Sequence, residues 1–508
     1  MADSTRWAKV VDHTRCIGCH ACTTACKSEN EVPLSVTRTY VKHVDIGTFP
    51  QARRAFQVTR CNQCERAPCT VACPTGAMFR RPDGIVDFDK SICIGCKACI
   101  AACPYDAIFI NPEDHSAEKC NFCAHRIDVG LEPACVVVCP TEAILVGDLS
   151  DPASKVSRIV HRETVSVRRP EKKTHPKLFY KGAHQATLDP LAARRPPGGL
   201  FQWSEQPGGP GSVPSGYPDA NGAGSANSSA AALLSYDVGH TAPWDWKVSL
   251  YTLTKGIASG AYLVALLLLL GGWLSGTGAL WRWSAPIVGL VFLGLTGVLL
   301  IADLEHPERF HLIFTRPRWK SWLVRGAFLI AGYAGIVGLH LLAEAGGRPD
   351  LATRLAWVGG PLAVLTAVYT AYLFAQSEAR DLWQSPLLPP HFLVQAILAG
   401  SAALVPVAAF TEPAAVRPLL WVLAGSSLLH LLLVLGEVTL THATAHARLA
   451  RWEMTRGQFG AYFRLGGALI AVAVAAPWIG IAIGPLALAG LLAYEHAYVQ
   501  AGQAVPLA

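Results

Sequence analysis

The most informative absence in this sequence is that of cysteine from its second half: all sixteen cysteines lie between Cys16 and Cys139, and none follows. Charge is also scarce, because charged residues make up 16% of the 508 residues whereas hydrophobic residues make up 51%. So little charge is unusual for a soluble protein and predicts a soluble part joined to a membrane part. Secreted disulfide scaffolds are short chains with scattered cysteines, so the regular grouping of these cysteines argues against one.

The N-terminus, MADSTRWAKVVDHTR, has neither an apolar stretch nor a twin-arginine pair. It resembles neither a secretory nor a Tat signal, and we expect the first domain to fold where it is made unless a partner carries it across the membrane. The net charge of +7 comes mostly from residues 1–200, which hold 27 Lys and Arg against 21 Asp and Glu. Anionic metal clusters account for such an excess, so we expect no nucleic-acid partner.

The cysteines form four groups with the spacing of ferredoxin motifs. The groups are Cys16-Cys19-Cys22-Cys26, Cys61-Cys64-Cys69-Cys73, Cys93-Cys96-Cys99-Cys103 and Cys120-Cys123-Cys135-Cys139. In two-cluster ferredoxins the fourth cysteine of a motif binds the cluster of the other motif, and a proline usually follows it. Pro74, Pro104 and Pro140 follow the last three groups, but Lys27 follows the first. Sixteen thiolates predict four 4Fe-4S clusters; zinc is the alternative, although zinc motifs rarely contain such triplets.

Composition divides the chain into three regions. In residues 1–182, the cysteine domain, we expect short strands, including a hairpin in which residues 77–79 and 85–87 flank the turn dipeptide Asp83-Gly84. Residues 183–243 are rich in Gly, Pro, Ser and Ala and predict an irregular linker. Residues 244–508 contain apolar runs near the roughly 20 residues that cross a bilayer. We place eight membrane spans at about 247–273, 284–304, 321–345, 354–376, 389–411, 415–440, 464–482 and 484–502.

The loops between these spans differ in basic residues. An even number of spans puts both ends of the membrane domain on one side, and the loops on that side carry Arg309, Arg316, Arg318, Lys320, Arg325, Arg380, Arg448, Arg451, Arg456 and Arg464. The far side carries only Arg282, Arg348, Arg354 and Arg417. By the positive-inside rule we expect a multi-pass protein of the cytoplasmic (inner) membrane, with its cysteine domain on the cytoplasmic face.

The cysteine motifs and the segment KTHPKLFYKG at 173–182 closely resemble the four-cluster iron–sulfur subunit of the dimethyl sulfoxide reductase family of molybdenum and tungsten oxidoreductases. The resemblance covers about residues 8–182 and implies that the first motif pairs with the fourth and the second with the third. The implied ligand sets are Cys16, Cys19, Cys22 and Cys139 for the first cluster; Cys26, Cys120, Cys123 and Cys135 for the second; Cys61, Cys64, Cys69 and Cys103 for the third; and Cys73, Cys93, Cys96 and Cys99 for the fourth.

The same resemblance implies a direction and a partner. The first cluster should lie nearest a large catalytic subunit that holds molybdenum or tungsten in a bis-pterin guanine dinucleotide cofactor. The fourth cluster should lie nearest the membrane. Nothing in this chain resembles a pterin-binding domain, so substrate catalysis is expected in the partner.

Ionisable residues within membrane spans are functional candidates, because placing them in lipid is costly. Lys255 and Tyr251 share a face of the first span, and Asp303 ends the second. Interfacial snorkelling is the alternative for each of them, and above all for Arg325.

Three stretches of the apolar half carry a second resemblance. WKVSLYTLTKGIASGAY at 246–262, ADLEHPERFHLIF at 302–314 and YEHAYVQAGQAVPL at 494–507 resemble the polysulfide reductase (NrfD-like) membrane-anchor family, over about residues 244–508. The resemblance implies eight helices, no haem, and a menaquinone or ubiquinone bound near the membrane-proximal cluster. The residues that we expect at the quinone site are Tyr251, Lys255, Asp303, His306 and Arg309. Among them Asp303 and His306 would exchange protons.

Histidines in the apolar half raise a haem alternative. His340, His391 and His430 lie in or near spans, where two facing histidines could ligate iron. Neighbouring spans lack the doubled histidine pattern of a two-haem cytochrome, so we expect no haem. His430 and Glu437 share a helical face and fit either a proton path or helix packing.

Together these features predict an α+β ferredoxin-like domain, built of two tandem two-cluster modules, fused to an all-α eight-helix transmembrane domain. The fusion would pass electrons between a catalytic subunit and membrane quinone. Cytoplasmic orientation favours a formate dehydrogenase complex by analogy. The alternatives are a subunit of a polysulfide or sulfur reductase that takes electrons from quinol, an electron-driven proton-translocating module, and a protein that reduces a soluble carrier.

Overall fold

The computed structural model describes residues 5–47, 49–193, 232–239 and 241–508. The chain divides into two compact units. Unit 1 comprises Met1–Pro243 with the short segments Ser377–Arg380 and Ala504–Ala508, and unit 2 comprises Trp244–Gln376 and Asp381–Gln503.

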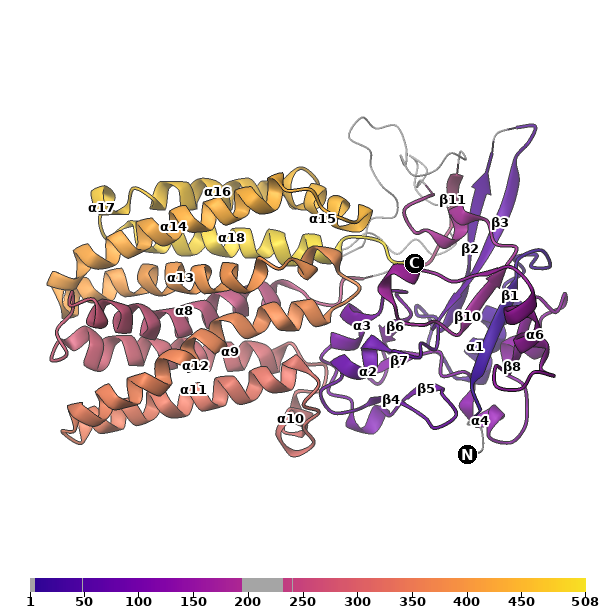
Figure 1. The fold of residues 1–508 in the computed structure, drawn as a ribbon, viewed down its shortest axis with the longest axis horizontal. Helices are drawn as coiled ribbons and strands as arrows, with labels where there is room; N and C mark the ends of the chain where they lie inside the picture. The colour runs from indigo at the N-terminus through magenta and orange to yellow at the C-terminus, as the bar shows by residue number, and fades with distance from the viewer. Residues whose placement is uncertain (1–4, 48, 194–231, 240) are drawn as a thin grey trace. The chain divides into compact units, whose positions relative to one another are not determined.

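The described residues of unit 1 form one four-stranded sheet, one three-stranded sheet and two two-stranded hairpins (Figure 1). The first has the order β8-β1-β10-β9, from Ile144–Asp148, Trp7–Asp12, Leu178–Lys181 and Val165–Ser166. The second has the order β11-β2-β3, from Ala232–Tyr236, Thr39–Ile46 and Arg53–Arg60. Strand β1 ends just before the first cysteine motif and β8 begins just after the fourth, and the two strands pair antiparallel with Val11 opposite Ile144. This pairing brings together two motifs that are far apart in the sequence.

Two hairpins connect the remaining motifs of unit 1. Strand β4 (Met78–Arg80) pairs with β5 (Val86–Phe88), and Gly84 in their turn has φ +79°. The hairpin expected at 77–87 is therefore confirmed. Strand β6 (Ile108–Ile110) pairs with β7 (Ala117–Lys119). The short helices of this unit are α1 (Ala21–Glu29), α2 (Pro68–Ala72), α3 (Ala98–Ala102), α4 (Ala124–Ile127), α5 (Ala134–Val137), α6 (Lys155–Arg162) and α7 (Gln185–Leu188).

The segment predicted as an irregular linker, 183–243, is ordered at both described ends. Helix α7 and strand β11 lie there, and β11 pairs with β2. Leu188 and Leu234 are buried, which explains why these ends join unit 1 despite the polar and glycine-rich composition of the segment. Residues 194–231 and 240 lie outside the described residues.

Unit 2 is a bundle of helices (Figure 1). The helices are α8 (Trp246–Leu270), α9 (Ala285–Ala302), α10 (Leu312–Thr315), α11 (Trp322–Ala345), α12 (Pro349–Gln376), α13 (Leu388–Thr411), α14 (Val416–Thr439), α15 (Ala445–Thr455), α16 (Gly460–Ala473), α17 (Ala476–Ile479) and α18 (Ile483–Gln503). Helix α8 packs against α9, α12, α13 and α18. Its central position buries Lys255 and most of its other side chains.

Among the described residues, six helices are long and apolar enough to cross a membrane. They correspond to the first six expected spans. The seventh span, expected at 464–482, is not one helix, because α16 ends at Ala473 and the short α17 follows. Pro477 at the start of α17 lacks the amide hydrogen that a continuous helix would need. The expected count of eight spans therefore stays a prediction.

Candidate metal centres and membrane site

Cysteine thiols from different motifs lie near one another in unit 1, both within and between the four implied ligand sets. Cys16 and Cys22 each lie within electrostatic range of Cys139. The other three sets show the same relation: Cys26 with Cys120, Cys123 and Cys135; Cys64 and Cys69 with Cys61 and Cys103; and Cys99 with Cys73, Cys93 and Cys96. Relations of the same kind also cross between the sets, from Cys22 to Cys135, from Cys61 to Cys120 and from Cys99 to Cys69. The four ligand sets implied by the resemblance therefore stay a prediction.

The space around the fourth set of cysteines bears on whether they could hold one cluster. A partly open pocket, with about 370 Å³ of empty space when open solvent is counted, is lined by Cys73, Cys93, Cys96 and Cys99, so these four residues border one common space. Within the described ranges, no three His, Cys, Asp or Glu side chains are close enough to hold a single metal ion. Ligands of a four-iron cluster lie farther apart than that, since each binds a different iron atom.

Backbone conformation shapes the cysteine loops in the same way at two motifs. The sequences CIGCHAC and CIGCKAC place glycines at Gly18 and Gly95, with φ +70° and +67°, and then His20 and Lys97, with φ +59° and +62°. The left-handed conformation favours glycine, because other residues carry a Cβ that clashes there. These turns lead directly into α1 and α3, which carry the third cysteine of each motif.

Hydrogen-bond donors surround several cysteine sulfurs. Backbone amides reach Cys73 Sγ from Met78, at 3.3 Å, and Cys139 Sγ from Ala143, at 3.2 Å. Such N–H···S bonds favour the thiolate over the thiol and are a means by which proteins tune iron–sulfur clusters.

Cys135 of the second set differs, because two cationic side chains donate to it. Arg60 Nη1 lies 3.0 Å and Lys9 Nζ 3.7 Å from Cys135 Sγ. Burial raises the pKa of the Cys135 thiol, but the charges of Arg60 and Lys9 outweigh burial and lower this pKa to about 7. In the sequence only the position of Arg60, next to Cys61, hinted at this role.

The position of the missing proline is occupied by a residue of helix α1. The helices α2 and α3 end at the residue before Cys73-Pro74 and Cys103-Pro104, whereas α1 continues past Cys26 to Glu29. Lys27 Nζ donates to the carbonyl oxygens of Pro33, at 2.7 Å, and Val36, at 2.6 Å. Proline would prevent both features, since it lacks an amide hydrogen and a cationic side chain.

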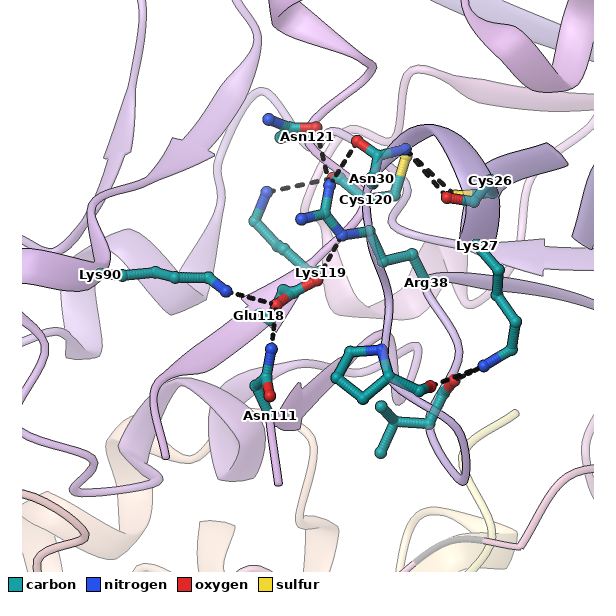
Figure 2. A network of polar contacts seen from close by, with 12 residues as sticks. Cys26, Lys27, Asn30, Arg38, Lys90, Asn111, Glu118, Lys119, Cys120 and Asn121 are labelled. Atoms are coloured by element: carbon teal, nitrogen blue, oxygen red, sulfur yellow. Dashed lines mark hydrogen bonds and ion pairs between the residues drawn. The ribbon is translucent and has the colours of Figure 1, made fainter. Parts of the chain in front are cut away.

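The extended α1 brings Asn30 to the second set of cysteines. Figure 2 shows Asn30 between Cys26 and Arg38, and its Nδ2 atom lies 3.7 Å from the sulfurs of both Cys26 and Cys123. Arg38 donates to Asn30 Oδ1 at 2.7 Å and to the buried Glu118 at 2.6 Å. Glu118 also accepts from Lys90 and Asn111, at 2.8 and 2.9 Å. Strand β7, which carries Glu118, is thereby linked to helix α1 beside Cys26.

Unit 2 separates the expected quinone-site residues into two groups. Tyr251 and Lys255 are buried one turn apart on α8, with exposed fractions of 3% and 1%. Asp303, at the end of α9, lies within electrostatic range of Tyr251. His306 and Arg309 lie in the loop after α9, where both contact Glu308.

A residue outside the expected site, Glu495, completes the surroundings of Lys255. Lys255 Nζ donates to the Ala367 carbonyl at 2.8 Å and to Thr370 Oγ1 at 2.7 Å. Glu495 is 4% exposed, accepts a hydrogen bond from Thr252 at 2.9 Å, and lies within electrostatic range of Lys255. The signal in the sequence was an ionisable residue within the apolar ending YEHAYVQAG.

Glu495 also lines a pocket within unit 2. The pocket has about 250 Å³ of empty space, and its polar lining includes Thr252, His391, Gln395, Tyr494 and Glu495. His391 Nε2 and His430 Nδ1 are 3.0 Å apart, so the imidazoles of two of the three noted histidines contact each other. Acid–base groups therefore converge beside a partly open pocket.

A second polar group lies about two helical turns farther along α8. The Tyr262 hydroxyl is 3.2 Å from Nδ1 of the buried His340, and Arg282 Nε is 2.5 Å from Glu344 Oε2. Glu437, noted in the sequence with His430, instead accepts from Tyr494 at 3.1 Å.

Two family descriptions match this chain. Residues 53–149 match "4Fe-4S dicluster domain" and residues 236–487 match "Polysulphide reductase, NrfD". A tetrathionate reductase subunit of Salmonella typhimurium is 42% identical over 200 residues, which cover 38% of this chain and 78% of that protein. The thiosulfate reductase electron transfer subunit PhsB of Salmonella typhi is 46% identical over 134 residues, covering 26% and 70%. Protein NrfC of Escherichia coli is 43% identical over 135 residues, covering 26% and 60%. The chain therefore belongs to the family of iron–sulfur subunits of the tetrathionate, thiosulfate and dimethyl sulfoxide reductases, joined in one polypeptide to a membrane anchor of the polysulphide reductase NrfD family.

Proposed function

We propose that this protein is the electron-transfer and membrane-anchor subunit of a quinone-linked oxidoreductase complex. It would carry electrons through four 4Fe-4S clusters between a separate catalytic subunit and quinone. One observation supports this above all: a single chain joins sixteen cysteines, whose thiols lie near one another across motifs, to a helical unit in which Lys255 and Glu495 are both buried and within electrostatic range of each other.

Different residues of this chain would serve electron transfer and proton exchange. Bound clusters would accept and release single electrons. The sixteen cysteines would hold them in the four sets described above, and the N–H···S donors would adjust their potentials. Quinone reduction also consumes two protons, which Lys255 and Glu495 are placed to exchange. Thr252 and Thr370 hold these two side chains by hydrogen bonds of 2.9 and 2.7 Å.

The catalytic partner would bind beside the first cluster, as the resemblance implies. Cys19 is exposed there, and the neighbouring Ile17 and Val137 expose 57% and 59% of their surface. Exposed apolar side chains around a redox centre favour a protein partner at that place. We propose that this partner is a large subunit with a molybdenum or tungsten bis-pterin cofactor.

The names of the relatives favour a different reaction for the complex from the one predicted from the sequence. The names of the Salmonella typhimurium and Salmonella typhi proteins assign them to tetrathionate and thiosulfate reductases. We therefore favour a complex that reduces an oxidised sulfur compound with electrons from quinol, and place the formate dehydrogenase predicted from orientation second. Identification of the large subunit that co-purifies with this chain distinguishes the two.

The substitution Lys255→Met tests the quinone site. Because Lys255 is buried within electrostatic range of Glu495, we expect a loss of at least tenfold in electron exchange with quinone, as for other positioned acid–base groups. The cluster spectra should stay intact, as recorded by electron paramagnetic resonance of the whole complex. The control is Lys247→Met on the same helix, since the side chain of Lys247 is partly exposed and forms an ion pair with Asp245. Unchanged quinone activity in Lys255→Met would remove this site from the proposal.

A second candidate function is an electron-driven proton-translocating module. The observation that favours it is the pair of buried polar groups that α8 joins through Lys255 and Tyr262, one with Glu495 of α18 and the other with His340 and Glu344 of α11. Buried ionisable residues in membrane helices commonly belong to proton paths.

The substitution Glu344→Gln tests the second candidate in sealed vesicles. If the second polar group carries protons, proton movement coupled to electron transfer should fall severalfold while quinone-linked electron transfer continues. Asp350→Asn, in the exposed first turn of α12, is the control. Equal proton movement in wild type and Glu344→Gln would reject this function for Glu344, and no proton movement in wild type would reject the function as a whole.

A further inference from the structure

Arg60 is a buried cation whose described partners are sulfur atoms rather than carboxylates. It ends strand β3, is 2% exposed, and lies within electrostatic range of Cys135, Cys22 and Cys120. One guanidinium nitrogen lies 3.0 Å from Cys135 Sγ. Its Nε and Nη2 atoms have no hydrogen-bond partner among the described residues.

Lys9 is a second buried cation at the same sulfur. It lies on β1, is 2% exposed, and places its ammonium group 3.7 Å from Cys135 Sγ and 4.1 Å from the centre of the Phe122 ring. Lys9 also lies within electrostatic range of Cys123. Two cations from two different sheets thus converge on the second set of cysteines.

Buried cations are costly unless an anion compensates them. In the part of the chain that the structure describes, neither Arg60 nor Lys9 forms an ion pair with Asp or Glu. Thiolates bound to iron, together with their cluster, carry negative charge at this place, and reduction adds one more. A buried positive charge stabilises the reduced form more than the oxidised form, because the attraction grows with the negative charge and is little screened.

The other sets have different surroundings. Buried Lys119 lies within electrostatic range of Cys61 and Cys69 of the third set, but its described hydrogen bonds go to backbone carbonyl oxygens. Cys73 and Cys139 accept from the backbone amides of Met78 and Ala143, which carry no net charge. Asn30 adds a neutral side-chain donor to the second set at Cys26 and Cys123. The second set therefore combines two formal positive charges with a neutral donor.

We propose that Arg60, assisted by Lys9, raises the reduction potential of the cluster held by Cys26, Cys120, Cys123 and Cys135. This inference rests on the proposed function, because it needs that cluster to be bound. The electron that reduces this cluster comes from a neighbouring cluster and leaves to the next, so no bond forms or breaks. Arg60 and Lys9 are positioning residues, since they act through the cysteine ligands, and their charges favour the reduced state of this cluster.

The test is a redox titration of the membrane-bound complex, followed by electron paramagnetic resonance. In Arg60→Met we expect the signal of the second cluster to shift to lower potential. A tenfold lower ratio of reduced to oxidised cluster at a fixed potential corresponds to about 59 mV for one electron. The first cluster should shift less, since Cys16 and Cys22 of that set lie within electrostatic range of Arg60 but the described hydrogen bond of Arg60 goes to Cys135. Arg60→Lys, which keeps the charge, should restore most of the potential.

Two further variants assign the effect. Lys9→Met should lower the potential of the same signal and leave the first cluster unchanged. Arg54→Met is the matched control, because Arg54 lies on the same strand but is half-exposed and paired with Asp45. Its potentials should equal those of wild type. Iron content is measured in every preparation, so that loss of a cluster is distinguished from a shift.

The outcomes separate this proposal from the proposed function. Unchanged potentials in Arg60→Met and Lys9→Met, with full iron content, would overturn the inference while electron transfer to quinone stands. If Arg60→Met loses iron, Arg60→Lys and Lys9→Met decide, and equal potentials in these two and wild type would overturn it. A wild-type protein without 4Fe-4S signals would reject the proposed function itself.

Discussion

Lys27 affects both the length of helix α1 and the packing of the loop beside the second set of cysteines. Its backbone amide allows α1 to continue past Cys26, and its side chain holds the carbonyl oxygens of Pro33 and Val36. The continued helix places Asn30 beside Cys26 and Cys123. A residue that departs from the usual motif therefore supports the site in two independent ways.

Two substitutions of Lys27 separate these contributions. Lys27→Met removes the side-chain hydrogen bonds and should lower the free energy of unfolding by about 1–3 kcal/mol. Lys27→Pro also interrupts the helix and should cost about 3 kcal/mol more. Thermal unfolding of the whole protein in detergent measures both. Equal stability of Lys27→Met and wild type would show that the contacts with residues 33 and 36 contribute little.

The crossing of α8 and α13 depends on glycine in both helices. A Cβ atom at Gly260 would overlap the carbonyl oxygen of Ala396, and one at Gly400 would overlap the backbone of Gly260. Gly256, one turn earlier, leaves room for ordinary contact with Ala399. The G-x-x-x-G spacing thus contains one position where close backbone approach excludes any side chain. This crossing fixes the helix that carries Lys255.

The variant Gly260→Ala should destabilise unit 2 by about 1–3 kcal/mol, because the two backbones must move apart. Its quinone activity should fall as well, since the position of Lys255 depends on α8. Gly335→Ala on α11 is the matched control, because no atom lies within 4 Å of the added Cβ. The thermal unfolding midpoint in detergent measures the difference. A midpoint equal to that of the control would contradict the close approach of α8 and α13.

At the scale of the whole molecule, the two units perform different tasks in one chain. Unit 1 holds all sixteen cysteines, and unit 2 holds the six long apolar helices. The distribution of arginine and lysine predicts which loops of unit 2 face the cytoplasm. Because unit 2 has no cysteine of its own, a single introduced thiol can report the side on which a loop lies.

We expect Arg348→Cys to react with a membrane-impermeant maleimide in intact cells. Arg318→Cys should react only after the membrane is opened, because its loop lies on the cytoplasmic side by the positive-inside rule. Protein with the native sequence is the control for labelling of cluster-binding cysteines. Reaction of Arg318→Cys in intact cells, with Arg348→Cys protected, would reverse the predicted orientation.

Much of the architecture could be predicted from local patterns. Regularly spaced cysteines predict a metal-binding domain, and long apolar runs predict membrane helices. The cysteine domain, the hairpin around Asp83-Gly84 and the first six apolar helices could therefore be predicted from the sequence. The seventh expected span is not one continuous helix, because hydropathy does not register the helix break before Pro477. The linker was predicted from composition, which misses the buried Leu188 and Leu234 at its ends.

The sequence by itself determined which atoms are available: sixteen thiols in motifs, and a few ionisable residues within apolar helices. Only the tertiary structure decided which of them meet. Arg60 and Lys9 converge on Cys135 because strands β3 and β1 bring residues far apart in the chain to one sulfur. Glu495 lies near Lys255 because α18 packs against α8. Charges act through space, and sequence distance carries no information about that separation.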